Sequence, residues 1–119
     1  MVTRSNKTPH LNWPREVREA LRDLQTSLRR LYGDQAPSVL LYGSYARGEA
    51  KETSDVDVLL IYPVDVPPGR EINQLGSILA DLNLRYQVLI SVLPVSKHTY
   101  QDTPGIFWKN IRQEAISLG

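Results

Sequence analysis

Apolar residues recur at helical spacing, three or four positions apart, in three stretches of the chain. The first stretch follows Pro14, ends at Gly33 and predicts an amphipathic helix. Its apolar positions are Val17, Leu21, Leu24, Leu28 and Leu31. A second predicted helix carries Ile72, Leu75, Leu79 and Leu82. A closing helix is predicted after the turn at Pro104-Gly105, with Phe107, Trp108, Ile111, Ala115 and Leu118 as its apolar positions.

Three short apolar runs lie between these helices and predict buried strands over residues 38–42, 55–62 and 86–93. A short helix is expected over residues 45–50, and the prolines of residues 63–69 predict a loop. Helices and strands therefore alternate, which is typical of an α/β fold with a small mixed sheet flanked by helices. We expect a single domain over residues 13–119, preceded by a flexible tail over residues 1–12.

The composition fits a small soluble protein. The chain has 119 residues, of which 41% are hydrophobic and 23% charged, and its formal net charge is +1. This near-neutral balance argues against a protein that coats nucleic acid. Cysteine is absent, which excludes disulfides, thiolate metal sites and cysteine nucleophiles. No apolar run reaches the roughly 20 residues of a membrane span, so we expect a cytoplasmic protein.

Two carboxylates open the second predicted strand. Asp55 and Asp57 stand at positions i and i+2, which lie on the same face of a strand about 6–7 Å apart. Two like charges at this spacing repel one another unless water or a cation lies between them. Mg²⁺ prefers hard oxygen ligands and usually takes its remaining ligands from water and nucleotide phosphates. Asp55 and Asp57 are therefore candidate metal ligands and candidate catalytic residues.

Gly43 and Ser44 end the first predicted strand and open the short helix. Glycine allows a tight turn that brings backbone N–H groups close to a ligand. The free amides at a helix start favour phosphate, and the Ser44 hydroxyl adds a further donor. Arg47, one turn later, is placed to bind a phosphate or a nearby carboxylate. Gly43, Ser44 and Arg47 are therefore the candidate nucleotide-binding residues.

Each of these features has a simpler interpretation when taken alone. An Asp-x-Asp arises by chance, a Gly-Ser often makes an ordinary turn, and a lone arginine is usually a surface residue. Their combination carries the prediction, because acids are disfavoured at the start of an otherwise apolar strand unless they serve a site. Two other sites are excluded. Glu49 stands where a Walker-A motif needs lysine, and His10 and His98 do not form a zinc-ligand pair.

Gly43-Ser44, ten intervening residues and Asp55-Val56-Asp57 resemble the signature of the DNA polymerase beta nucleotidyltransferase superfamily. The sequence from Gly43 to Glu49 is similar to that of the minimal nucleotidyltransferases of prokaryotes. The resemblance implies a polymerase-beta-like fold. It also implies that Gly43 and Ser44 hold the triphosphate and that Asp55 and Asp57 bind Mg²⁺. The implied reaction transfers a nucleotide, AMP from ATP, to a hydroxyl group.

The same resemblance implies a partner. Proteins of this kind are often encoded beside an all-helical protein of the HEPN type in toxin–antitoxin pairs. The expected acceptor is then a tyrosine of that partner. Because 119 residues leave no room for a separate acceptor-binding domain, acceptor specificity is expected to come from a partner protein. Whether the chain also forms homo-oligomers is left open by the sequence.

One departure from the family pattern stands out. Relatives usually carry a third carboxylate on a following strand, but residues 86–93 contain neither Asp nor Glu. Gln87 and Ser91 are polar positions there, although neither is a general base at neutral pH. Elsewhere in the chain, Asp81 and Asp102 are the candidates for the third acid. A second hypothesis therefore stands beside the enzyme: a degenerate transferase that acts only by binding a helical HEPN-type partner.

Overall fold

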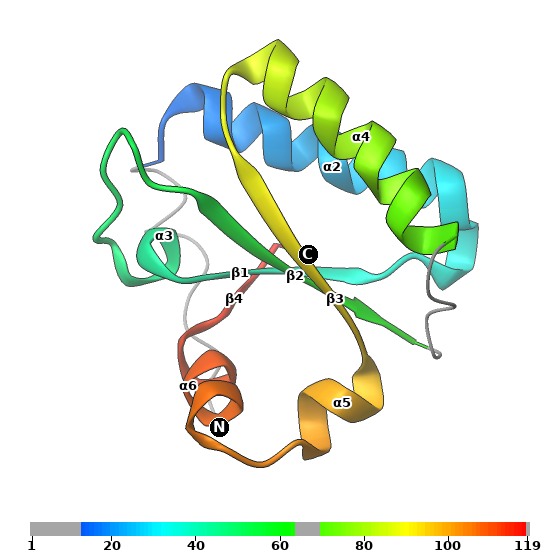
Figure 1. Cartoon of the computed structure of the whole chain (residues 1–119), viewed down its shortest axis with the longest axis vertical. Helices are drawn as coiled ribbons and strands as arrows, with labels where there is room; N and C mark the ends of the chain where they lie inside the picture. Colours follow the sequence, from blue (N-terminus) through cyan, green and yellow to red (C-terminus); the bar gives the residue numbers. More distant parts are fainter. Residues whose placement is uncertain (1–12, 64–69, 119) are drawn as a thin grey trace.

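A four-stranded mixed sheet forms the centre of the computed structural model, which describes residues 13–63 and 70–118 (Figure 1). The strand order is β3-β2-β1-β4. The strands are β1 (Ser38–Tyr42), β2 (Val56–Tyr62), β3 (Ile90–Ser96) and β4 (Ile116–Ser117). β1 pairs antiparallel with both β2 and β4, whereas β2 and β3 run parallel. The predicted α/β class with a small mixed sheet is confirmed.

Helices cover both faces of this sheet. One face carries two long helices, α2 (Arg15–Tyr32) and α4 (Arg70–Tyr86), and a single 3-10 turn, η1 (Gly33–Gln35), follows α2 (Figure 1). The opposite side carries the shorter helices α5 (Lys97–Asp102) and α6 (Ile106–Glu114). The four-residue helix α3 (Ser44–Arg47) fills part of the connection between β1 and β2. α3 thus lies at one end of the sheet, where β1 finishes and β2 begins.

The alternation of side chains along the strands divides the apolar residues into two groups. The larger group lies under α2 and α4, where four of the five apolar positions predicted for α2 are buried. The fifth, Leu31, is 39% exposed. The smaller group joins Leu59 of β2 to Ile111 and Ala115 at the end of α6. This second group fixes the C-terminal end of α6 against the sheet.

The predicted third strand was displaced along the chain. The sequence pattern placed it over residues 86–93, but α4 continues to Tyr86 and β3 begins only at Ile90. The helix is longer because Tyr86 lies one turn beyond buried Leu82 and its hydroxyl donates to Asp23 of α2. Gln87 then adopts a left-handed conformation, with φ of 54°, that turns the chain. Pro94 is tolerated within β3 because this strand lies at the edge of the sheet.

The C-terminal prediction was also partly wrong. α6 ends at Glu114 instead of continuing to Leu118, and Ile116–Ser117 forms the edge strand β4. The Leu118 N–H donates to the Val39 carbonyl at 3.0 Å, which extends the pairing beyond β4. Ile116 is fully buried. The apolar spacing of this segment fits a helix and a short strand equally well, and pairing with β1 selects the strand.

Two shorter elements differ from expectation as well. The helix expected over residues 45–50 is α3 (Ser44–Arg47), and α5 was not predicted. The predicted tail over residues 1–12, and the predicted loop beyond Pro63, lie outside the described residues. Within the described part of the chain, no helix combines the length and the apolar character needed to cross a membrane.

Candidate functional site

The turn that follows β1 lies directly against the first residues of β2. Antiparallel pairing sets Tyr42 opposite Asp57, so Gly43 lies beside the Asp57 side chain. A methyl group on Gly43 would overlap the Asp57 carboxylate and come within 3.2 Å of its Cγ. Gly43 also has φ of 77°, a conformation that other residues rarely adopt. The structure therefore brings the glycine turn and one of the predicted acids into contact.

The two predicted acids lie at the start of β2. Asp57 is its second residue and is half-buried, while Asp55 is exposed one residue before the strand. Burial raises the pKa of the Asp57 carboxyl above its ordinary value, and the nearby negative charge of Asp55 raises it further. The Arg47 guanidinium acts in the opposite direction and lowers it. The two acids are thus close enough to repel one another, as their spacing predicts.

The remaining predicted site residues belong to α3. Ser44 is its first residue and Arg47 its last, and Gly48 ends the helix in the left-handed conformation. The Arg47 Nε donates to Glu49 at 2.9 Å, and its Nη1 donates to Glu114 at 3.3 Å. The structure therefore groups the turn at Gly43, the cation of Arg47 and the acid pair at one end of the sheet.

Glu114 is a member of this group that the sequence pattern did not indicate. It is the last residue of α6, and its Oε1 accepts a hydrogen bond from the Gly43 N–H at 3.4 Å. Seventy-one positions separate the two residues along the chain, so no local spacing relates them. The predicted helix continued to Leu118, so no sequence signal marked Glu114 as the end of a helix.

The two candidates for a third acid, and the two polar positions predicted on the third strand, are distributed over other parts of the fold. Asp81 pairs with Arg85 on α4, and Asp102 pairs with His98 on α5 at 2.8 Å. Gln87 lies in the turn before β3 and therefore not on the strand. Ser91 does lie on β3, where parallel pairing sets it beside Asp57. Of these four positions, only Ser91 shares a strand pairing with the acid pair.

The acid pair fits a hard divalent cation. Asp55 and Asp57 supply carboxylate oxygens, and a cation between them would relieve the repulsion that raises the pKa of Asp57. Within residues 13–63 and 70–118, no three Asp, Glu or His side chains are grouped closely enough to hold a metal ion. The protein would then contribute two ligands, which suits Mg²⁺ because this ion usually keeps water or phosphate as its other ligands.

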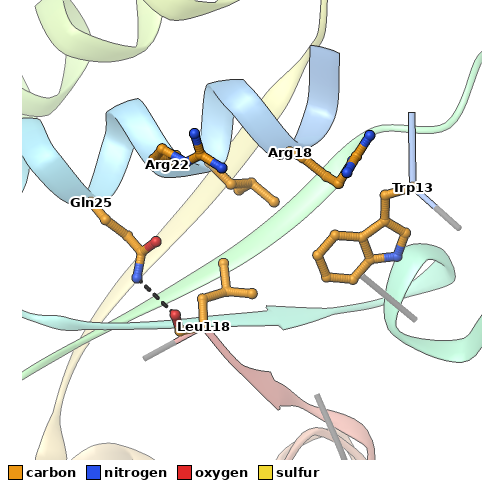
Figure 2. Close-up of a pocket in the computed structure, with 6 residues that line it drawn as sticks. Trp13, Arg18, Arg22, Gln25 and Leu118 are labelled. Carbon is orange, nitrogen blue, oxygen red and sulfur yellow. Dashed lines mark hydrogen bonds between the residues drawn. The ribbon is translucent and has the colours of Figure 1, made fainter. Parts of the chain in front are cut away.

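A separate pocket lies between α2 and the chain that follows β4 (Figure 2). Its volume is about 250 Å³, and its described lining residues are Trp13, Arg18, Leu21, Arg22, Gln25 and Leu118. Gln25 Nε2 donates to the Leu118 carbonyl at 3.0 Å (Figure 2), and buried Trp13 donates to the Tyr45 carbonyl at 3.3 Å. None of these lining residues is a predicted site residue, so the pocket is distinct from the site at Gly43 and Asp57.

Comparison with known proteins gives consistent matches. The family model of the nucleotidyltransferase domain matches residues 17–115. A Methanocaldococcus jannaschii protein named "putative protein adenylyltransferase" is 33% identical over 82 residues, or 69% of this chain and 82% of that protein. A second protein of that name and organism is 27% identical over 84% of this chain and 95% of its own length. A solved "putative minimal nucleotidyltransferase" has a TM-score of 0.53 at 25% identity, covering 84% of this chain and 94% of that one.

Proposed function

The chain belongs to the nucleotidyltransferase domain family, and from this membership and the site geometry we propose that it transfers AMP from ATP to a hydroxyl group. The observation that carries the proposal is the contact between Gly43 and Asp57. It joins a turn suited to phosphate to an acid pair suited to Mg²⁺. The turn for the phosphates and the acids for the metal are therefore adjacent, as a nucleotide with its metal requires.

The proposed reaction is a displacement at phosphorus. The acceptor oxygen forms a bond to the α-phosphorus of ATP while the bond from that phosphorus to the bridging oxygen of the β-phosphate breaks. Pyrophosphate leaves with the electron pair of that bond, and the hydroxyl proton passes to water. When bound, Mg²⁺ supplies positive charge that stabilises the phosphate oxygens. Positioning and electrostatic stabilisation account for most of the rate gain in such a site.

Each predicted residue has a role in this proposal. Asp55 and Asp57 hold the metal, Gly43 allows the turn to approach the triphosphate closely, and Ser44 binds the triphosphate through its backbone N–H group and its hydroxyl. Arg47 binds a phosphate oxygen with the part of its guanidinium that Glu49 and Glu114 leave free. Ser91 is paired with Asp57 between β2 and β3 and therefore belongs to the same end of the site. The proposal needs no third acid on β3.

The proposed acceptor is a hydroxyl on a protein. Two of the relatives carry names that denote transfer of AMP to protein, and the resemblance to toxin–antitoxin nucleotidyltransferases favours a tyrosine of a helical HEPN-type partner. We place this reaction in the cytoplasm because ATP and Mg²⁺ are held there.

The test uses ATP labelled with ³²P at the α-phosphate, Mg²⁺ and the helical protein encoded beside this gene. We expect label in the partner from α-labelled ATP and none from γ-labelled ATP, because pyrophosphate leaves. Changing Asp55 and Asp57 together to Asn should reduce labelling at least about a hundredfold. The matched control changes Asp81 and Asp102 to Asn, since both pair within their own helices. Equal labelling by both double variants would show that Asp55 and Asp57 do not carry the reaction.

A second candidate function follows from the acid-free β3 strand, in which Ser91 stands beside Asp57. In this function the protein is an inactive transferase, and binding to its helical partner is its whole role. Calorimetry separates the two functions. Tight partner binding together with no detectable binding of ATP in the presence of Mg²⁺ would favour the binding protein over the enzyme.

A further inference from the structure

We propose that Glu114 is a positioning residue that holds the Gly43 turn and the Arg47 guanidinium in the arrangement that binds the nucleotide phosphates. This inference rests on the proposed function, since it assigns a role within the same site. Glu114 is then a third carboxylate of the site, supplied by helix α6 instead of strand β3.

A single oxygen of Glu114 joins two parts of the site. Its Oε1 accepts from the Gly43 N–H at 3.4 Å and from Arg47 Nη1 at 3.3 Å. The Glu114 side chain is only 22% exposed, so these contacts are partly shielded from water. Hydrogen bonds that involve an ionised partner are stronger than neutral ones. Glu114 therefore fixes the peptide group before Gly43 and one edge of the Arg47 guanidinium together.

The position of Glu114 in α6 supports a specific role. It is the last residue of the helix, where exposed carbonyl groups make negative charge unfavourable. The positive charge of Arg47 and the Gly43 N–H offset this unfavourable placement. Ile111 and Ala115 lie on either side of Glu114 along the chain and are both buried. The carboxylate is consequently held on a backbone that packing fixes against the sheet.

The contacts of Arg47 leave one nitrogen of its guanidinium available for a ligand. Its Nε donates to Glu49 and its Nη1 to Glu114, whereas Nη2 has no hydrogen-bond partner among the described residues. A guanidinium held on two sides has few orientations left, so binding an anion with Nη2 costs less conformational entropy. Glu114 thus prepares Arg47 for a phosphate oxygen.

Glu114 is distinct from the metal ligands. Its carboxylate bonds to Gly43 and Arg47, and the described residues contain no grouping of three carboxylates fit for a metal ion. Glu114 therefore acts on the phosphate-binding side of the site, while Asp55 and Asp57 form the other side.

The first test measures the affinity of the full chain for a non-hydrolysable ATP analogue with Mg²⁺ by calorimetry. Glu114→Ala should weaken binding about tenfold, because both positioning bonds are lost. Glu114→Gln should bind with intermediate affinity, because its carbonyl oxygen still accepts from the Gly43 N–H. The matched comparison is Glu49→Ala, which removes the other partner of Arg47 but no bond to Gly43 and should weaken binding less than Glu114→Ala does. Equal or tighter binding by Glu114→Ala would overturn the proposal.

The second test needs no nucleotide. Hydrogen exchange at the Gly43 amide, followed by NMR, should be several-fold faster in Glu114→Ala than in the wild type and unchanged in Glu49→Ala. Thermal unfolding of each variant verifies that the fold is retained. If the wild type binds no nucleotide, the proposed function fails, and the exchange rates still decide the role of Glu114 in the turn. Identical exchange in the three proteins would contradict that role.

Discussion

Gly43 has two separate reasons to be glycine, and the chain contains a control that separates them. Its φ of 77° is left-handed, and a Cβ at this position would overlap the Asp57 carboxylate. Gly48 has a nearly identical φ of 74°, but a Cβ there would meet nothing within 4 Å. Of these two glycines, only Gly43 combines backbone strain with a steric requirement of the site.

We expect Gly48→Ala to lower the free energy of unfolding by about 1–2 kcal/mol, the cost of a left-handed alanine. Gly43→Ala should lower it by a further 1–3 kcal/mol or so, because the methyl group displaces Asp57. Urea unfolding measures both values. Nucleotide labelling of the partner should be lost only in Gly43→Ala. Equal destabilisation by the two substitutions would contradict the close packing of Gly43 against Asp57.

Tyr62 makes the stability of the protein sensitive to alkaline pH. Burial raises the pKa of its phenol from 10.0 to about 12, so the folded protein keeps a proton that the unfolded chain releases. The stabilisation is complete below pH 10 and is lost as the pH rises from 10 to 12. Over this range the wild type should lose up to about 1.4 kcal/mol per pH unit more than Tyr62→Phe.

The measurement is urea unfolding at a series of pH values between 9 and 12, with Tyr32→Phe as the control. The Tyr32 and Tyr62 hydroxyl groups lie 3.3 Å apart, so either substitution removes the same hydrogen bond. Tyr32→Phe leaves the Tyr62 phenol in place and should retain the steep alkaline loss. Parallel pH profiles for the wild type and Tyr62→Phe would show that Tyr62 is not the source.

The grouping of the predicted site residues at one end of the sheet was predictable from the sequence because their relation is local. Asp57 lies on β2 and Asp55 one residue before it, and Gly43, Ser44 and Arg47 lie within one turn of a strand end. Glu114 could not be found in this way, because its contact with Gly43 depends on how α6 packs across the sheet. Local spacing carries no information on such a contact.

At the scale of elements, the alternation of the longer helices and strands was predictable, whereas the start of β3 and the edge strand β4 were not. The strands β1 and β2 nearly coincide with the predicted runs, since each is bounded by proline or glycine. The start of β3 depends on Tyr86, which is drawn into α4 by its contact with α2. β4 depends on a free edge of β1. Both differences arise from tertiary contacts that override local preference.

The edge strand β4 can be tested directly. Ile116 is fully buried beside β1, so Ile116→Ala should lower the free energy of unfolding by about 2–4 kcal/mol. The matched control is Ile106→Ala at the start of α6, where the side chain is 70% exposed and the expected change is within about 0.5 kcal/mol. Guanidinium unfolding compares the two. A small effect at Ile116 would contradict the pairing of β4 with β1.

At the scale of the whole molecule, the site joins layers that are otherwise separate. The acid pair comes from the sheet, the turn from the end of β1, and Glu114 from a helix on one face. A ligand that binds the acid pair and the turn, which Glu114 holds in place, links these elements only in the folded state. Such a ligand stabilises the fold by mass action, in proportion to the logarithm of its concentration over its dissociation constant.

We therefore expect a non-hydrolysable ATP analogue with Mg²⁺, at about 100 times its dissociation constant, to stabilise the fold by about 2.7 kcal/mol. For a domain of this size, the melting temperature should rise by on the order of 10 °C. EDTA should abolish most of this rise, because removing the cation leaves Asp55 and Asp57 facing the triphosphate as like charges. The double change of Asp55 and Asp57 to Asn should bind the analogue without dependence on Mg²⁺. A rise that is equal with and without EDTA in the wild type would contradict a metal site at the acid pair, and the labelling experiment would then have to find its catalytic groups elsewhere.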